Sequence, residues 1–273
     1  MRKYLCSLLC LALWISCGMT AQAGEVSGDN YVDTIIAEKN AAQKETISGI
    51  DALMKRRIQE QGQATSGIAS YDLSGAYQVY MMEPLFLTIY NENGSFASTI
   101  TDTVQWKVPI KESGGEDGLA VFSEGEDGLT FAGTVMGEAA NTWMVSDEGI
   151  RTSVAQSKQI RSEIKKLQIA HSYMYQTTFV YLQNADGEYL IPYSVDADEV
   201  GIQNEKTYTV SGLMKIFSKY YDEEQVVKNP NYNGGVPVRQ SRHIAPIIYV
   251  IGVLAAGMGG GVLYYVIRKK KQS

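Results

Sequence analysis

The chain has 273 residues, and its 24 lysines and arginines stand against 30 aspartates and glutamates, which gives a net charge of −6. Six of the basic residues lie near the two ends, so the long middle part is more acidic than the whole chain. An acidic surface repels phosphate backbones, and we therefore expect no nucleic-acid partner. All 3 cysteines precede residue 18, which leaves the rest without a disulfide framework, a cysteine nucleophile or a zinc finger.

Residues 1–23 have the pattern of a secretory signal peptide. Two basic residues precede a short apolar run, and the small residues Ala21 and Ala23 stand three and one positions before the expected cleavage point. We expect the mature chain to begin at Gly24. Two alternatives stay open: the segment is retained as a membrane anchor, or the chain is processed as a lipoprotein at Cys17.

Residues 244–267 form a second apolar segment, which contains no charged side chain. At about 1.5 Å per residue, a helix of this length crosses the roughly 30 Å hydrocarbon core of a bilayer. A basic cluster follows directly and predicts the cytoplasmic side of the membrane. Its members are Arg268, Lys269, Lys270 and Lys271. We expect a single-pass membrane protein whose body lies outside the cytoplasm.

Small residues recur through this apolar segment at four-residue spacing. They are Gly252, Ala256, Gly257, Gly260 and Gly261. Small side chains let two membrane helices approach closely, so the segment predicts a homodimer or a contact with a partner helix. The alternative is that these glycines reflect the ordinary composition of membrane helices.

The body between the two apolar segments has no cysteine, although an extracytoplasmic compartment permits disulfides. This absence favours a bacterial protein. The expected organisation is a signal peptide (1–23), an extracytoplasmic α+β domain (24–221), a juxtamembrane stalk (222–243), a transmembrane helix (244–267) and a cytoplasmic tail (268–273).

The pattern of apolar residues predicts an α+β fold, in which antiparallel hairpins pack with one long and two shorter helices. Apolar residues at a spacing of three to four predict helices over 31–62, 154–171 and 210–221. Short β-branched and aromatic runs, separated by Gly, Asn and Asp, predict strands. These strands lie at 76–82, 85–90, 104–110, 119–122, 129–135 and 142–145, with two more flanking 184–187.

Two segments share an N-x-[ND]-G-x-aromatic pattern, one within Leu87–Phe96 and the other within Phe179–Tyr189. Asn and Gly supply the positive φ angles of tight hairpins, so each segment predicts a hairpin. The likeness predicts two diverged halves, about 24–150 and 151–221. The alternative is that two unrelated hairpins share the same turn chemistry.

Two acidic turns, Gly115–Gly118 and Gly125–Gly128, place carboxylates close enough in sequence to suggest a calcium site. Asp-Gly is also the favoured pair for hairpin turns, and we expect two solvated turns instead. The segment starting at Asp196 begins like a calcium loop, but Val200 and Thr207 stand where the loop needs oxygen ligands. We therefore expect no metal site and no cofactor.

No catalytic constellation is visible in the sequence. The body's one deep histidine, His171, is expected at a helix end with a structural role, since no nucleophile or orienting acid can be assigned to it. The sequence also lacks the G-x-S-x-G, H-E-x-x-H and Walker motifs. We therefore predict no catalytic residues. The 18 tyrosines suit either half-buried sheet positions or a face that binds glycans or proteins.

These patterns predict a membrane-anchored bacterial surface protein whose acidic domain binds an extracellular ligand, such as a peptide, a glycan or another protein. Two alternatives remain. One is an extracytoplasmic sensor or accessory subunit of a membrane complex. The other is a cell-envelope hydrolase that uses a pair of carboxylates.

The small residues of the membrane segment give a first prediction. Replacing Gly257 and Gly261 by Ile keeps the segment apolar but prevents close approach of two helices. We expect weaker chemical cross-linking of the full-length protein in membranes, by an amount that corresponds to about 1 kcal/mol. Unchanged cross-linking would show that these glycines do not pack against another helix.

Overall fold

The computed structural model describes residues 30–61 and 67–224. The expected signal peptide, transmembrane helix, cytoplasmic tail and most of the stalk lie outside the described residues. Within the part that is described, no helix combines the length and the apolar character that a membrane crossing requires.

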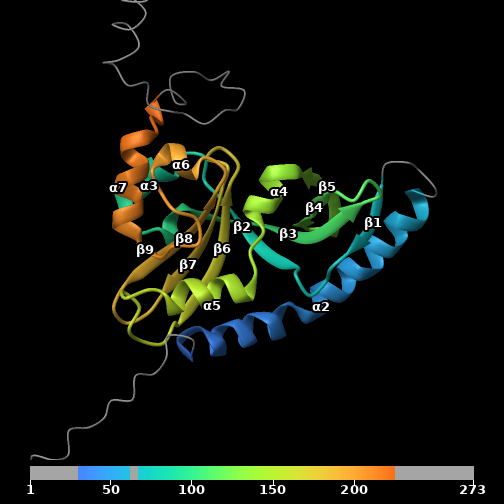
Figure 1. The fold of residues 1–273 in the computed structure, drawn as a ribbon, viewed down its shortest axis with the longest axis horizontal. Coiled ribbons are helices and arrows are strands. Elements are labelled where there is room, and N and C mark those ends of the chain that lie inside the picture. Colours follow the sequence, from blue (N-terminus) through green and yellow to red (C-terminus); the bar gives the residue numbers. More distant parts are fainter. Residues whose placement is uncertain (1–29, 62–66, 225–273) are drawn as a thin grey trace, which may run out of the picture.

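The described chain has an α+β fold built on one nine-stranded sheet (Figure 1). The strands run in the order β5-β4-β3-β2-β6-β7-β8-β9, and β1 pairs with β3. Their bounds are β1 (Ile68–Tyr71), β2 (Tyr77–Met82), β3 (Ile100–Glu112), β4 (Asp117–Gly125), β5 (Gly128–Met136), β6 (Lys166–Ser172), β7 (Thr177–Gln183), β8 (Glu188–Ser194) and β9 (Tyr208–Thr209). The expectation of an antiparallel sheet was wrong at one place, because β2 and β6 pair in parallel.

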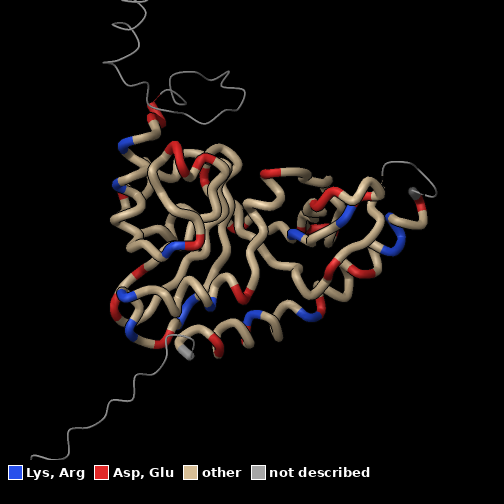
Figure 2. The backbone as a smooth tube through the Cα atoms, in the orientation of Figure 1, with Lys and Arg blue, Asp and Glu red and all other residues tan. Residues whose placement is uncertain are grey.

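The β2–β6 contact divides the sheet into two groups of strands, β1–β5 and β6–β9. The long helix α2 (Asn30–Gln61) runs beneath both groups and confirms the predicted N-terminal helix (Figure 1). Its first half packs Val32 and Ile36 against β2, β7 and β8, and its second half packs Ile50 and Met54 against β1, β3 and β4. Figure 2 shows acidic and basic residues interspersed along its length. The buried apolar stripe packs α2 onto the sheet, and ion pairs of Asp33 with Arg151 and of Lys39 with Asp147 add contacts near its first half.

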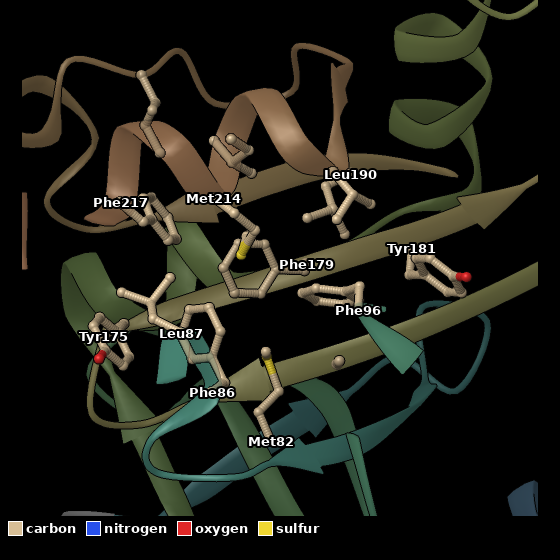
Figure 3. Close-up of a cluster of buried hydrophobic side chains, with 14 of the residues drawn as sticks. Met82, Phe86, Leu87, Phe96, Tyr175, Phe179, Tyr181, Leu190, Met214 and Phe217 are labelled. Carbon is tan, nitrogen blue, oxygen red and sulfur yellow. The ribbon is translucent and has the colours of Figure 1, made fainter. Parts of the chain in front are cut away.

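A core of aromatic and sulfur-containing side chains fills the space between β6–β8 and three helices (Figure 3). The helices are α3 (Phe86–Asn93), α6 (Ala197–Val200) and α7 (Val210–Tyr220), and the short 3₁₀ helix Ala97–Thr99 follows α3. Phe86 meets the ring of Tyr175 edge-on at 4.7 Å, and both are fully buried. α7 confirms the prediction of a helix over 210–221, and its buried face covers this core.

The strand predicted at 85–90 was wrong, because these residues belong to α3 and the preceding turn. The N-terminus of α3 has no side-chain cap from its own residue Leu85. Instead, the carboxylate of the buried Glu223 accepts hydrogen bonds from the backbone N–H groups of Leu87, at 3.0 Å, and Thr88, at 2.7 Å. The Thr88 and Tyr175 hydroxyls donate to the same carboxylate. A residue more than 130 positions away thus satisfies the free amides of this helix.

Two further expectations were wrong. The strand predicted at 142–145 is the end of α4 (Gly137–Trp143) and the segment after it. The helix predicted over 154–171 is α5 (Asp147–Ala155), then an irregular segment, then β6. The apolar residues between 160 and 171 fit a helical spacing, but Leu167, Ile169 and His171 also alternate, and pairing with β7 selects the strand.

The hairpin predicted within the first of the two similar segments was also wrong. Residues 87–96 form most of α3 and its end rather than a hairpin, and Gly94 caps that helix in the left-handed conformation at φ 70°. The second segment is a hairpin as predicted, because β7 and β8 pair on either side of Asn184–Gly187. Asn and Gly therefore ended a helix in one segment and closed a hairpin in the other.

The carboxylate of Glu223 gives a second prediction. Replacing it by Ala leaves two backbone amides and two hydroxyls without their acceptor, and we expect the free energy of unfolding to fall by about 2 kcal/mol or more. Glu223→Gln keeps one acceptor oxygen and should cost less. Urea denaturation of the full chain measures both effects. Glu92→Ala removes an exposed acid from α3, the helix that Glu223 caps, and serves as the control. Equal stability of the Glu223 and Glu92 variants would contradict the capping role.

Candidate functional site

The most unusual cluster of side chains lies where the two groups of strands meet, under the end of α4. It consists of Lys107 of β3, His171 of β6, Trp143 of α4 and Tyr173, which follows β6. We refer to these four residues as the junction site. Within the described residues, Lys107 Nζ and His171 Nε2 are two of the buried polar atoms that have no hydrogen-bond partner.

Strand register brings these residues together. Lys107 pairs with Tyr77, and its neighbours Trp106 and Val108 pack on the opposite face, against α2. His171 lies on the strand that joins β2 in parallel, where Met81 pairs with it. The chain leaves β5 at Gly137, whose φ of 71° favours glycine, and α4 then brings Trp143 over both side chains.

Lys107 is fully buried, and its ammonium nitrogen lies 4.8 Å from the centre of the Trp143 ring. The face of an indole attracts a cation, but it does not replace the hydrogen bonds that water gives an ammonium group. Burial therefore lowers the pKa of Lys107 to about 7. Near neutral pH this lysine is divided between its charged and neutral forms.

His171 is also fully buried and packs edge-on against two aromatic rings, those of Trp143 and Tyr173, each at a centroid distance of 4.5 Å. Its Nδ1 lies 2.9 Å from the hydroxyl oxygen of Thr178. Burial, with a smaller effect from the charge of Lys107, lowers the pKa of His171 well below its usual value. The ring is therefore neutral at pH 7. When Nδ1 accepts from Thr178, Nε2 carries the proton and is a free donor.

Trp143 is held at both its backbone and its ring. Its carbonyl accepts a hydrogen bond from Tyr77 at 2.6 Å, and its Nε1–H donates to the carbonyl of Gln176 at 2.9 Å. At the rim, the Tyr173 hydroxyl donates to Gln105 at 2.9 Å, and this tyrosine is 40% exposed. Aromatic side chains therefore separate the two unpartnered nitrogens from solvent, and one of them, Tyr173, reaches the surface.

A cleft of about 450 Å³ lies beside the junction site, between β1, β3 and α4. Its lining includes Pro109, Asn141 and Met144. Pro109 follows Lys107 by two positions on β3 and so lies on the same face of the sheet. Asn141 and Met144 flank Trp143 in sequence. The segment that carries Trp143 therefore contributes to the wall of the cleft, and the indole itself packs against Lys107.

The structure places the other predicted features elsewhere. The two acidic segments are the turns that join β3 to β4 and β4 to β5, as expected for hairpin turns. The segment at Asp196 contains the short helix α6 rather than a loop of calcium ligands. Among residues 30–61 and 67–224, no group of three or more His, Cys, Asp or Glu side chains could hold a metal ion.

The expected position of His171 needs correction. His171 lies in a strand rather than at a helix end, so no helix dipole favours its protonated form. For the tyrosines, the structure supports sheet and core positions more than an exposed binding face. Tyr77, Tyr175, Tyr181, Tyr189 and Tyr193 are buried, whereas Tyr173 is exposed.

Sequence reasoning missed Lys107 and Trp143. Lys107 stands within the run Val104–Ile110, which was correctly predicted as a strand. A lysine between Trp106 and Val108 in such a run is a sequence signal that could have indicated a buried charge. The burial of this lysine depends on α4, which was not predicted as a helix and whose last two residues were assigned to a strand. The glycines and basic residues expected to act in the membrane segment lie outside the described residues.

The lowered pKa of Lys107 gives a third prediction. In the unfolded chain the lysine pKa is near 10.4, so between pH 7 and that value the unfolded chain binds more protons than the folded one. Stability therefore rises with pH across this window, and the cost of the buried charge is complete below pH 7. We expect Lys107→Met to raise the free energy of unfolding at pH 7. The gain should shrink by roughly 1 kcal/mol per pH unit toward pH 9.

Urea denaturation at pH 7, 8 and 9 measures this gain. Lys111→Met removes an exposed lysine from the same strand and serves as the control, for which we expect no comparable trend. A Lys107→Met variant that is less stable than the parent protein at pH 7 would contradict the interpretation.

Comparison with known proteins provides no relative from which a role for these residues could be transferred. No family model, curated protein or solved structure matches the chain. The functional argument therefore rests on the geometry of the junction site.

Proposed function

We propose that this chain is a membrane-anchored bacterial surface protein whose extracytoplasmic α+β domain binds a ligand without converting it. The apolar segments at the two ends of the sequence support the anchored topology. One observation supports binding: Lys107 and His171 direct unpartnered polar atoms into an aromatic enclosure. Buried polar groups are normally hydrogen-bonded, and a ligand that supplies the missing partner would account for these two neighbouring nitrogens.

Binding fits this site better than catalysis. General-base catalysis by histidine needs a nucleophile on one side and an orienting group, usually a carboxylate, on the other. His171 faces the hydroxyl of Thr178 on one side, and aromatic rings cover it on the others. Neither contact provides a carboxylate. The site therefore has donors that can hold a ligand but lacks the group that would orient a base.

A sensor or accessory subunit is a second candidate, and the contact of Glu223 favours it. This residue begins the segment expected to lead to the membrane, and its buried carboxylate is bound to α3 and Tyr175. A shift of the core around α3 would thus reach the chain that enters the stalk. If the hydrogen exchange of the Leu87 and Thr88 amides is the same with and without ligand, this role is contradicted.

The hydrolase alternative has one supporting feature. In the described part of the chain, Asp196 is the carboxyl group whose pKa is raised, first by burial and then by the nearby charge of Glu199. Two carboxyl groups with different pKa values are the arrangement that glycoside hydrolysis uses. Glu199, however, accepts a hydrogen bond from Tyr220 at 2.9 Å. Turnover of wall glycans by the purified full-length protein would establish this alternative in place of binding.

The anchored topology gives a fourth prediction, which uses the absence of cysteine after residue 17. In Ala52→Cys, the new thiol lies on the exposed side of α2. A membrane-impermeant maleimide should label it in intact cells, after removal of any outer barrier. In Ser273→Cys, the thiol belongs to the expected cytoplasmic tail and should react only after the cells are permeabilised. Labelling of Ala52→Cys only after permeabilisation would overturn the proposed location of the domain.

A further inference from the structure

We propose that the junction site binds the carboxylate group of a small organic acid, held between the Lys107 ammonium and Nε2–H of His171. This inference rests on the proposed binding function and names the chemical class of the ligand. It requires that the two groups offer suitable donors, that the enclosure suits an organic molecule, and that the ligand has a route to them.

The two groups together match one carboxylate in charge and in hydrogen-bonding capacity. Lys107 provides one positive charge, and the neutral His171, in the tautomer whose Nδ1 accepts from Thr178, provides a second donor without adding charge. Both lie against the same indole ring of Trp143. A single carboxylate has two oxygens and one negative charge, so it would satisfy both donors and compensate the buried cation. A phosphate dianion would bring a second charge for which this pair has no cation.

The ionisable side chains around the site leave the cation without an anionic partner. Burial alone lowers the pKa of Lys107, with no contribution from a nearby carboxylate. The neighbouring titratable groups are Tyr77 of β2, which pairs with Lys107, and the two tyrosines whose charges affect Tyr77, namely Tyr173 and Tyr193 of β8. Burial raises the pKa of each of them. These tyrosines are therefore neutral at pH 7, and an external anion would be the first negative charge near Lys107.

The walls favour an organic acid over an inorganic ion. Trp143 and Tyr173 present aromatic rings to the imidazole, and Leu119 packs against Trp143. The neighbouring cleft also has apolar members, among them Pro109 and Met144. A ligand with an acid at one end and a hydrocarbon or aromatic body at the other would contact both the donors and these surfaces.

Access to Lys107 requires a movement of Trp143, which is buried. The cleft of about 450 Å³ is lined by Asn141 and Met144, which belong to the same short segment as Trp143. The indole ring is held by one hydrogen bond, from its Nε1–H to Gln176, and by its packing against Lys107 and the neighbouring rings. We infer that the ligand enters from this cleft when the Trp143 side chain moves away from Lys107. The ring would then cover the body of the ligand, and its fluorescence should report the change.

The test uses purified full-length protein in detergent, titrated with benzoate and butyrate in a calorimeter at pH 6.5. Benzamide and butanamide have the same shapes without the charge, and inorganic phosphate provides an anion without a hydrocarbon body. We expect binding of at least one carboxylate and no binding of its amide. Binding should weaken at least tenfold in Lys107→Met. It should stay unchanged in Lys215→Met, which removes an exposed lysine from α7.

The pH dependence supplies a second readout. The bound carboxylate needs the charged lysine, so affinity should fall as pH rises above 7, approaching tenfold per pH unit. At pH 8, binding should also take up protons, which titrations in two buffers of different ionisation enthalpy detect. Lys107→Met should lose this dependence. Because that variant is expected to be more stable than the parent protein, misfolding would not explain the loss of binding.

Three outcomes would overturn the inference. Carboxylate binding that persists in Lys107→Met would place the ligand elsewhere, and loss in Lys111→Met alone would place it in the open cleft. Binding of phosphate but of no carboxylate would contradict the ligand class. If no probe binds while Ala52→Cys is still labelled in intact cells, the carboxylate assignment fails and the anchored topology remains supported.

Discussion

The fold depends on how two groups of strands are held together across a short parallel contact. β2 and β6 pair only at Tyr80 with Ala170 and at Met81 with His171, whereas β3 and β4 pair over eight positions. A contact this short gives little stability by itself. Packing across it therefore decides the arrangement: α2 packs against strands of both groups, and Trp143 of α4 contacts Lys107 of β3 and His171 of β6. Lys107 is buried because α4 brings Trp143 over it.

Sequence patterns predicted the parts of the fold whose determinants are local. The long helix α2, the hairpin of β7 and β8 and the amphipathic α7 each have a periodicity and end signals that agree. The errors occurred where a distant residue decides the structure. α3 depends on Glu223, and β6 pairs not only with the adjacent β7 but also with β2, far earlier in the chain. A short window of sequence contains neither of these distant partners.

The candidate site could not be predicted for the same reason. Its residues lie on β3, α4 and β6, separated by dozens of positions, and none belongs to a motif with a fixed spacing. A lone lysine or histidine in a strand normally reaches solvent or a partner. Only the three-dimensional arrangement shows that Lys107 and His171 share one enclosure and that neither has a hydrogen-bond partner for its free nitrogen.

The fixing of Glu223 also affects how mechanical load enters the domain. A pull on the chain beyond this residue would first meet four hydrogen bonds to its carboxylate, spread over α3 and Tyr175, before it reached the end of α7. The force would therefore spread into the aromatic core, and it would not simply unwind α7 from its last turn. For a domain on a tether, such an attachment also restricts swivelling, so the domain would keep a constant orientation relative to the first residues of its tether.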